Sequence, residues 1–301
     1  MLRVTLLLLA TLIPFSAQAE PLRVVASFSI IADITREIGG DAIAVTSLVQ
    51  PNSDAHMYEP TPTDVKTVAK AQLIIVNGLG FEGWLKRLIN ASGYKGALVE
   101  AAHGVKPLHM EEEGEHHDHH HEAADPHAWH DVANAKQYTK NIRDALIKAD
   151  PAHSAQYQAN AQTYLNKLDE LDSWAHRSIQ SVPISKRKII TSHDAFGYLA
   201  HAYNISISSP QGLSTDSQPS AKQVAQLIDQ IRREKITAIF IENLSESRLI
   251  QQITADTGAV IRGTLYSDAL SDSKGPATTY LTMFRHNMAL LIEAMRNNPE
   301  V

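Results

Sequence analysis

Strand-like and helix-like stretches alternate along the first part of the chain, and this order constrains the fold more than any other feature. Short apolar runs typical of buried strands lie at residues 23–27, 42–49 and 73–77. Between them, residues 30–38 have the apolar spacing of a helix that two glycines end, and residues 61–70 begin with a capping threonine and a proline, as helices do. This order of strands and helices predicts a parallel sheet with helices on both faces.

The second part of the chain has the same alternation. We expect its strands and helices at residues 187–192, 195–203, 205–209, 219–233, 238–242, 261–266 and 280–295. The stretch 218–220 before one helix resembles the stretch 59–61 before its counterpart, which alone is weak evidence of duplication. The sequence therefore predicts an α/β fold with two similar lobes, each containing a parallel sheet flanked by helices.

A long helix is expected between the two lobes. Apolar side chains recur at helical spacing through residues 151–180, with no proline or glycine inside the segment. At 1.5 Å per residue such a helix would be about 40 Å long and would act as a rigid connector. Two shorter helices with a bend are the alternative. The expected domains are residues 20–150 for the N-terminal lobe, 151–180 for the connecting helix and 181–301 for the C-terminal lobe.

The N-terminus has the pattern of a secretory signal peptide. Arg3 is followed by an apolar run over residues 4–13 and then by the small-x-small sequence of residues 17–19. The run is too short for an ordinary membrane anchor, and no cysteine follows it for lipid attachment. We therefore expect residues 1–19 to be removed and the protein to be released into the periplasm. An uncleaved N-terminal anchor is the alternative.

Histidine is the unusual feature of the composition. The 301 residues include 15 histidines and no cysteine, so neither thiol catalysis nor thiolate metal ligation is available. A site for a soft transition metal would have to use imidazole. The formal net charge of −6 is mild and favours neither nucleic acid nor an anionic membrane as a partner.

Many of the histidines lie in one polar segment, residues 103–122. Its densest part carries, among acidic residues, His116, His117, His119, His120 and His121. Such a segment cannot build a packed core and is typical of metal-binding insertions, in which imidazole favours Zn²⁺, Cu²⁺ or Ni²⁺. We expect a mobile loop that binds metal more weakly than the main site and scavenges it, hands it inward or senses its abundance. A merely solvated, charged loop is the alternative.

Four further side chains lie where a ligand site is expected. They are His56, His127, His193 and Asp268. His56, His193 and Asp268 each follow a predicted strand, and ligands in open α/β sheets bind beyond the carboxyl ends of strands. His127 directly follows the polar loop, and we expect it to begin a helix that faces the same crevice.

These four side chains form a set suited to one zinc ion. Three imidazoles and one carboxylate match the tetrahedral coordination of Zn²⁺. Two of the four come from each predicted lobe, so binding would be coupled to a relative movement or an ordering of the lobes. Four protein ligands leave no position for a reactive water, which favours holding the ion over hydrolysis.

Four sequence motifs carry a resemblance to a known family. They are Asp54-Ala55-His56-Met57-Tyr58-Glu59-Pro60, Asp125-Pro126-His127-Ala128-Trp129, Ser192-His193-Asp194-Ala195-Phe196-Gly197-Tyr198 and Ser267-Asp268-Ala269-Leu270. In this order they resemble the cluster A-I (ZnuA/TroA-like) solute-binding proteins of metal ABC transporters, over essentially the whole mature chain. The resemblance implies two lobes bridged by a long helix, with the four side chains above as metal ligands.

The resemblance also bears on the choice of metal. In this family the third ligand position is commonly glutamate in manganese-binding members and histidine in zinc-binding ones, so His193 indicates zinc. The acidic, histidine-rich loop is likewise similar to that of zinc members. Softness gives the same preference independently, because replacing an oxygen donor by imidazole shifts a site away from Mn²⁺.

Some residues depart from the family pattern or have two interpretations. Ala55 stands where proline is usual, which is expected to loosen the loop that holds His56. His130 stands where leucine is frequent, and we interpret it as an exposed bystander or as a transient ligand during transfer. Glu59 is interpreted as a hydrogen-bond partner of a ligand, as an alternative carboxylate ligand, or as a charge at the start of a helix. Asp194 is interpreted as orienting an imidazole through a hydrogen bond or as a solvent-exposed helix cap.

We therefore expect a non-enzymatic periplasmic carrier that captures Zn²⁺ and delivers it to the permease of an ABC importer. The expected partners are that permease and a periplasmic zinc metallochaperone, and the carrier is expected to be monomeric. A manganese or iron carrier of the same family is one alternative. A secreted zinc hydrolase is another, but it would need an open metal position and a base such as Glu59, and the sequence has no His-Glu-x-x-His pair.

Overall fold

The computed structural model describes residues 20–110, 123–216, 218–244 and 248–299. The predicted signal peptide and the histidine-rich stretch of residues 111–122 lie outside these ranges. Among the described residues, no helix combines the length and the apolar character needed to cross a membrane.

The N-terminal lobe contains a parallel sheet, as predicted, and the sheet has four strands rather than the three expected. In the order β2-β1-β3-β4, its strands are Ile43–Val49, Leu22–Phe28, Leu73–Val76 and Ala97–Glu100. The central strands β1 and β3 are apolar and almost entirely buried because helices cover both faces of the sheet. The edge strand β4 is mostly exposed.

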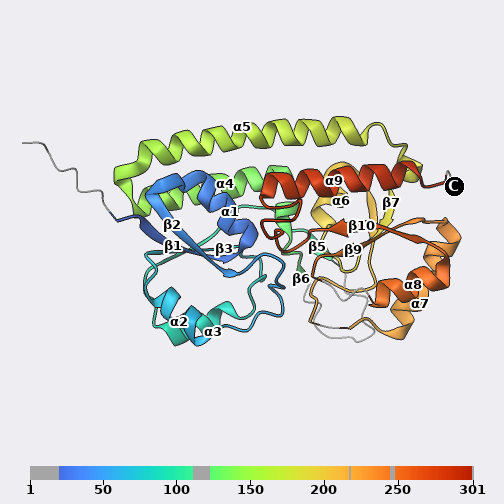
Figure 1. Cartoon of the computed structure of the whole chain (residues 1–301), viewed down its shortest axis with the longest axis horizontal. Helices are drawn as coiled ribbons and strands as arrows, with labels where there is room; N and C mark the ends of the chain where they lie inside the picture. The colour runs from blue at the N-terminus through green and yellow to red at the C-terminus, as the bar shows by residue number, and fades with distance from the viewer. Residues whose placement is uncertain (1–19, 111–122, 217, 245–247, 300–301) are drawn as a thin grey trace, which may run out of the picture.

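Helices lie on both faces of this sheet (Figure 1). They are α1 (Ser29–Gly39), α2 (Pro62–Ala69), α3 (Leu85–Ser92) and α4 (Val132–Ala149). The start predicted for α2 is observed: the Thr61 hydroxyl accepts from the Asp64 N–H, and the Asp64 carboxylate accepts from the Thr61 N–H in return. Helices α1 and α4 lie toward the long helix of the molecule, and α2 and α3 cover the opposite face (Figure 1).

The C-terminal lobe contains a second four-stranded parallel sheet. In the order β10-β9-β7-β8, its strands are Val260–Leu265, Ala238–Glu242, Lys188–Ile190 and Ser206–Ser208. Its helices are α6 (Gly197–Tyr203), α7 (Ala221–Glu234), α8 (Arg248–Thr257) and α9 (Tyr280–Arg296). The predicted fold class of two similar α/β lobes is therefore confirmed.

The connector is one continuous helix, α5 (Ser154–Ile179), which follows a 3-10 turn at Pro151–His153. Its 26 residues correspond to about 39 Å, and the alternative of two shorter helices is not observed. It lies across both lobes and packs on α1 and α4 at one end and on α6 and α9 at the other (Figure 1).

The hydrophobic core is continuous between the lobes. One cluster of buried side chains includes strands β1 and β3, helices α4 and α5, and most of α9. A second, smaller cluster is confined to the C-terminal lobe, where α7 and α8 cover its sheet. The lobes are therefore joined by packed side chains as well as by the connecting helix.

Two short antiparallel strands lie at the ends of the histidine-rich stretch. They are β5 (His109–Met110) and β6 (Ala123–Ala124), and they pair His109 with Ala124 and Met110 with Ala123. The described residues on either side of residues 111–122 are therefore paired with each other.

Candidate metal centre

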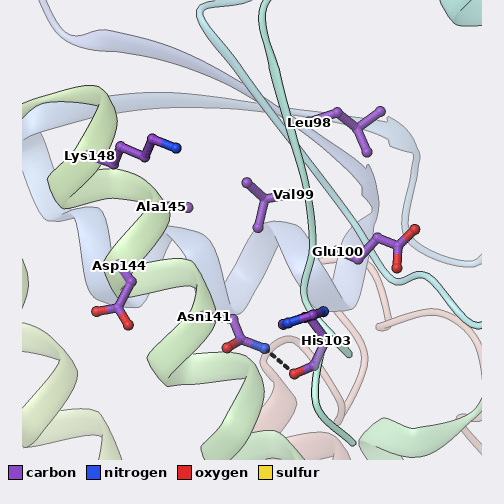
Figure 2. Close-up of a pocket in the computed structure, with 8 residues that line it drawn as sticks. All are labelled: Leu98, Val99, Glu100, His103, Asn141, Asp144, Ala145 and Lys148. Carbon is purple, nitrogen blue, oxygen red and sulfur yellow. Dashed lines mark hydrogen bonds between the residues drawn. The ribbon is translucent and has the colours of Figure 1, made fainter.

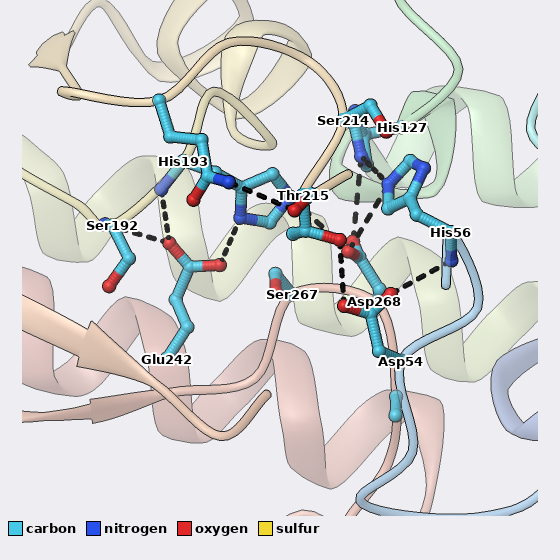
Figure 3. A network of polar contacts seen from close by, with 12 residues as sticks. Asp54, His56, His127, Ser192, His193, Ser214, Thr215, Glu242, Ser267 and Asp268 are labelled. Carbon is cyan, nitrogen blue, oxygen red and sulfur yellow. Dashed lines mark hydrogen bonds and ion pairs between the residues drawn. The ribbon is translucent and has the colours of Figure 1, made fainter. Parts of the chain in front are cut away.

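The four side chains singled out in the sequence converge at one point between the lobes (Figure 3). Each offers one nitrogen or oxygen atom, and these atoms of His56, His127, His193 and Asp268 lie within 4.8 Å of one another. The Nε2 atoms of His56 and His127 are 3.3 Å apart. Asp268 lies 3.5 Å from His56 Nε2, 3.5 Å from His127 Nε2 and 3.2 Å from His193 Nε2. Such a group could hold one metal ion.

The chain reaches this point from four separate segments. His56 lies in the loop after β2, His193 in the loop after β7 and Asp268 in the loop after β10. These are carboxyl ends of parallel strands, where α/β folds place their ligands. His127 lies between β6 and a 3-10 turn, Ala128–His130, and Asp131 then caps α4 through the Ala133 N–H.

The loop of His56 is held by Asp54 and by the Trp84 side chain. Asp54 Oδ1 accepts from the backbone N–H groups of His56 at 2.8 Å and Met57 at 3.3 Å. The Trp84 indole donates to the Ala55 carbonyl at 2.9 Å, and Ala55 itself is buried. The segment is therefore fixed by side-chain bonds to its backbone.

His127 is held by Asp125. One oxygen, Asp125 Oδ1, accepts from the His127 backbone N–H at 2.9 Å and lies 2.8 Å from ring Nδ1. Asn77 donates to the Pro126 carbonyl at 2.8 Å, and the Tyr138 hydroxyl donates to Asn77 at 2.6 Å. All of these groups are buried, so both the backbone and the ring of His127 are constrained.

His193 is held by Glu242 in the same way. Glu242 Oε1 accepts from the backbone N–H groups of Ser192 at 2.8 Å and His193 at 3.0 Å. Its other oxygen, Oε2, lies 2.5 Å from His193 Nδ1 (Figure 3). Glu242 is the last residue of β9, the strand next to β7, so it reaches across to the loop where His193 lies.

The charges around the cluster favour an ionised Asp268. Burial alone would raise the pKa of Asp268, but the neighbouring His193 and His127 lower it well below its ordinary value. Burial would lower the pKa of His193, yet Glu242 and Asp268 raise it well above its ordinary value.

Aromatic rings lie next to the cluster. The ring centroid of Phe81 is 4.9 Å from that of His56, and the ring centroid of Trp129 is 5.3 Å from that of His127. Aromatic walls therefore limit the access of water to the polar centre.

His130 is buried, which corrects its interpretation as an exposed bystander. Its side chain is fully inaccessible, and its ring packs against that of Phe196, with the centroids 4.5 Å apart and the ring planes tilted by 41°. Burial, followed by the repulsion from His127, lowers its pKa to about 3, so the ring is neutral. It is not among the converging atoms of the cluster. His130 therefore contributes to the packed interface between the lobes.

The roles suggested for Glu59 and Asp194 stay predictions. Glu59 is exposed. The Asp194 backbone N–H donates to the Gly212 carbonyl at 3.2 Å, and burial raises the pKa of the Asp194 carboxyl to about 6. The carboxylates that contact the imidazole rings are instead those of Asp125, beside His127, and Glu242, beside His193. The sequence did not lead us to expect either contact. The one signal for Glu242 was its position as the last residue of a predicted strand, and this alone did not distinguish it from an ordinary strand residue.

A separate surface cavity lies between β4 and α4 (Figure 2). It has a volume of about 460 Å³, and its lining includes Leu98, His103 and Lys148 but none of the four converging residues. Asn141 on its floor donates to the His103 carbonyl at 2.8 Å. The cluster of His56, His127, His193 and Asp268 therefore lies outside this cavity.

Comparison with known proteins gives consistent similarities over nearly the whole chain. Residues 24–294 match the family described as zinc-uptake complex component A, periplasmic. The chain is 33% identical to the manganese-binding lipoprotein MntA of Halalkalibacterium halodurans over 281 residues, 93% of this chain and 90% of that protein. It is 36% identical to the iron-binding protein YfeA of Yersinia pestis over 269 residues, 89% of this chain and 84% of that one. It is 32% identical to the metal ABC transporter substrate-binding lipoprotein SsaB of Streptococcus sanguinis over 286 residues, 93% of this chain and 91% of that one.

Solved structures show the same fold. The periplasmic zinc binding protein TroA from Treponema pallidum has a TM-score of 0.84 and 30% identity, and the match covers 91% of this chain and 99% of that chain. The Mn-bound periplasmic metal binding protein from Candidatus Liberibacter asiaticus has a TM-score of 0.80 and 31% identity over the same shares.

Proposed function

The chain belongs to the family described as zinc-uptake complex component A, periplasmic, and from that premise we propose that it carries Zn²⁺ to an ABC importer. At the level that its relatives share, it is a metal-binding, substrate-binding protein of a metal ABC transporter. The finer proposal is that His56, His127, His193 and Asp268 bind one zinc ion between the lobes and release it to the membrane permease.

The observation that carries this proposal is the spacing of the donor atoms. Metal bonds of about 2.0–2.2 Å place the ligands of a tetrahedral zinc ion roughly 3.3–3.6 Å apart. The separation of 3.3 Å between His56 Nε2 and His127 Nε2 lies in this range, and so do those of 3.5, 3.5 and 3.2 Å, within about 0.1 Å, between the three Nε2 atoms and one or the other oxygen of Asp268. One donor atom from each of the four side chains lies within 4.8 Å of the others, so the side chains are close to a tetrahedral arrangement and would close further around an ion.

The nature of the donors supports zinc over manganese. Three of the four are imidazole nitrogens, which suit Zn²⁺, whereas Mn²⁺ prefers oxygen-rich sites. Relatives of this chain are named for manganese or iron, and a structural neighbour is named for zinc. A manganese or iron carrier of the same family is thus the second candidate, and the metal preference is the property to measure.

We propose carriage rather than catalysis for this site. Four protein donors complete a tetrahedral shell and leave no position for an activated water. The base suggested for a hydrolase, Glu59, is exposed, and its carboxylate is not among the four converging atoms. Relatives of the chain are named as binding and transport proteins.

The remaining parts of the proposal concern location, partners and organisation. We propose that residues 1–19 direct export to the periplasm, that the protein acts as a monomer, and that a zinc metallochaperone loads it. The division into residues 20–150, 151–180 and 181–301 is proposed as the domain organisation. His116, His117, His119, His120 and His121 are proposed as a weaker metal-binding loop.

A competition titration tests the proposed metal and site together. Residues 20–301 would be titrated with Zn²⁺ and Mn²⁺ against a chromophoric chelator, beside the variants His193→Ala and His201→Ala. We expect a preference for zinc and a loss of more than about 100-fold in zinc affinity for His193→Ala, beyond the 10–100-fold typical of residues that only support a ligand. His201 is an exposed histidine of the same lobe and serves as the matched control. Stronger binding of Mn²⁺ would favour the second candidate, and unchanged affinity in His193→Ala would exclude the proposed ligand set.

A further inference from the structure

Two buried carboxylates contact the Nδ1 atoms of two proposed histidine ligands, on the side of each ring away from Asp268. Asp125 Oδ1 lies 2.8 Å from His127 Nδ1 in the N-terminal lobe, and Glu242 Oε2 lies 2.5 Å from His193 Nδ1 in the C-terminal lobe. Asp125 is fully buried and Glu242 is 3% exposed. Each carboxylate also accepts from the backbone N–H of the same histidine, at 2.9 Å for His127 and 3.0 Å for His193. Each histidine is thus held by its backbone and by its ring at once.

The side of the ring that the carboxylate occupies decides which nitrogen can bind a cation. A carboxylate accepts hydrogen bonds, so the Nδ1 atom facing it must carry a proton. In the neutral ring, which is the form that binds a metal, the lone pair is then on the other nitrogen, Nε2. In both histidines Nε2 is the atom that faces Asp268, at 3.5 Å for His127 and 3.2 Å for His193.

We infer that Asp125 and Glu242 are positioning residues that fix the tautomer and the ring orientation of His127 and His193, so that both Nε2 atoms face the cation. This inference rests on the proposed function of the site. One such residue comes from each lobe, so each half of the cluster is prepared independently of the other. His56 is held through its backbone, by Asp54 at 2.8 Å.

Charge gives the same two residues a second effect. Asp125, Glu242 and Asp268 are all buried around the imidazoles, so their negative charges are poorly screened by solvent. Together they attract a divalent cation more strongly than the single carboxylate of Asp268 would. A neutral amide at either position would keep the shape but remove both the charge and the strict requirement for a proton on Nδ1.

A glycine in the opposite lobe is needed for the position of Asp125. A Cβ atom on Gly197 would lie 2.6 Å from Asp125 Oδ2, much closer than such atoms approach in proteins. Gly197 begins α6, four residues after His193 in the sequence. A methyl group at residue 197 would therefore displace the Asp125 carboxylate, while every proposed ligand and both carboxylate residues keep their chemical identity.

The inference is tested with Asp125→Asn and Glu242→Gln in the protein comprising residues 20–301. We expect each variant to lose about 10–100-fold in zinc affinity in the chelator competition assay. Asp33→Asn is the matched control, since it removes another buried carboxylate that contacts the Tyr280 backbone N–H rather than a histidine ring. We expect Asp33→Asn to bind zinc as the wild type does.

Nitrogen NMR of the imidazoles separates positioning from a general loss of structure. In the zinc-loaded wild type we expect protonated, hydrogen-bonded Nδ1 atoms on His127 and His193 and metal-bound Nε2 atoms on both. The Asp125→Asn and Glu242→Gln variants should each lose the hydrogen-bonded Nδ1 signal of their own histidine alone. A loss of both signals together in either variant would contradict the inference, because it would indicate disruption of the whole site.

A double-mutant cycle uses Gly197 as an independent probe. Gly197→Ala should weaken zinc binding when Asp125 is present and have no further effect in an Asp125→Ala background, where the added methyl group meets no carboxylate. Equal effects in both backgrounds would contradict the inference. Wild-type affinity in both amide variants would overturn it while leaving the proposed function intact. A wild-type protein without a tight zinc site would overturn both.

Discussion

Exposure differs among the four converging side chains. The His56 side chain is 7% exposed, whereas those of His127 and Asp268 are fully buried and that of His193 is 1% exposed. A cation that reaches the site therefore meets His56 first, and the other three donors lie behind it. Entry and release are expected to involve movement of the His56 loop.

A buried carboxyl away from the site makes stability depend on pH. Asp33 in α1 accepts from the Tyr280 backbone N–H at 2.7 Å, at the start of α9, and is 9% exposed. Burial raises its pKa from 3.8 to about 6 despite this bond. The native state then binds the proton more tightly than the unfolded chain does. The resulting stabilisation is complete below pH 3.8 and is lost as the pH rises through about 6.

The variant Asp33→Asn tests this dependence. A rise in pKa from 3.8 to about 6 corresponds to about 3 kcal/mol of stability, which an amide that cannot ionise should not lose at neutral pH. Relative to the wild type, the variant should therefore gain about 3 kcal/mol in free energy of unfolding between about pH 4 and about pH 7. Urea unfolding of both metal-free proteins over this range measures the difference. A difference that stays constant with pH would refute the assignment to Asp33.

The sequence located the converging residues better than their supports. His56, His193 and Asp268 follow apolar strands, and parallel strands bring their carboxyl ends to one edge, so their meeting was predictable. Glu242 looked like an ordinary strand residue, because its role depends on β9 lying beside β7, which only the folded sheet shows. The burial of His130 was likewise unpredictable, since it depends on Phe196 of the other lobe.

At the scale of elements, the segment of residues 209–216 connects the loops of two proposed ligands. At one end, His193 pairs with Gln211 in an isolated parallel bridge. At the other end, the Thr215 hydroxyl donates at 2.7 Å to Asp54 Oδ2, the carboxylate that also holds the His56 backbone. Thr215 thus joins the C-terminal lobe to the most exposed of the proposed ligands.

We predict that Thr215→Val speeds the release of zinc. Valine keeps the shape of threonine but cannot donate to Asp54, so the His56 loop should open more easily. A loss of about 1–2 kcal/mol corresponds to a rate increase of about 5–30-fold, measured by stopped-flow transfer of zinc to a chelator. Thr215→Ser keeps the hydroxyl and should release zinc at the wild-type rate. Equal rates for the valine variant and the wild type would show that the contact does not limit release.

The pairing of β5 with β6 allows a clean deletion of the histidine-rich stretch. Because Met110 lies opposite Ala123, residues 111–122 can be replaced by Asn-Gly, the sequence preferred in two-residue hairpins. We expect the shortened protein to keep the tight site but to bind fewer zinc ions in total, measured by calorimetric titration. Loss of all zinc binding would show instead that the stretch is part of the tight site.

Not all elements could be predicted from sequence patterns. Strand β4 was missed because it is an exposed edge strand of four residues, and its apolar run is only three residues long. A helix was expected to begin at His127, but Ala128–His130 form a 3-10 turn, and α4 begins only at Val132, where the Asp131 side chain caps it. Helices α2, α7 and α9 begin at capping boxes, and the first two were recognised from those residues.

At the scale of the whole molecule, the segment that carries Asp268 is bonded to the N-terminal lobe. The Trp129 indole donates to the Ser267 carbonyl at 3.0 Å, and the Leu270 N–H donates to the Ser29 hydroxyl at 3.0 Å. Three of the four donors are thus held by the N-terminal lobe, and His193 is the donor carried by the rest of the C-terminal lobe. Relative movement of the lobes would chiefly separate His193 from the others.

The most direct test of the central claim is a crystal structure of the zinc-loaded protein with anomalous diffraction data on both sides of the zinc absorption edge. We predict one strong peak between the lobes, about 2.0–2.2 Å from the Nε2 atoms of His56, His127 and His193 and from a carboxylate oxygen of Asp268. A peak elsewhere, or no peak at this point in crystals grown with stoichiometric zinc, would contradict the account.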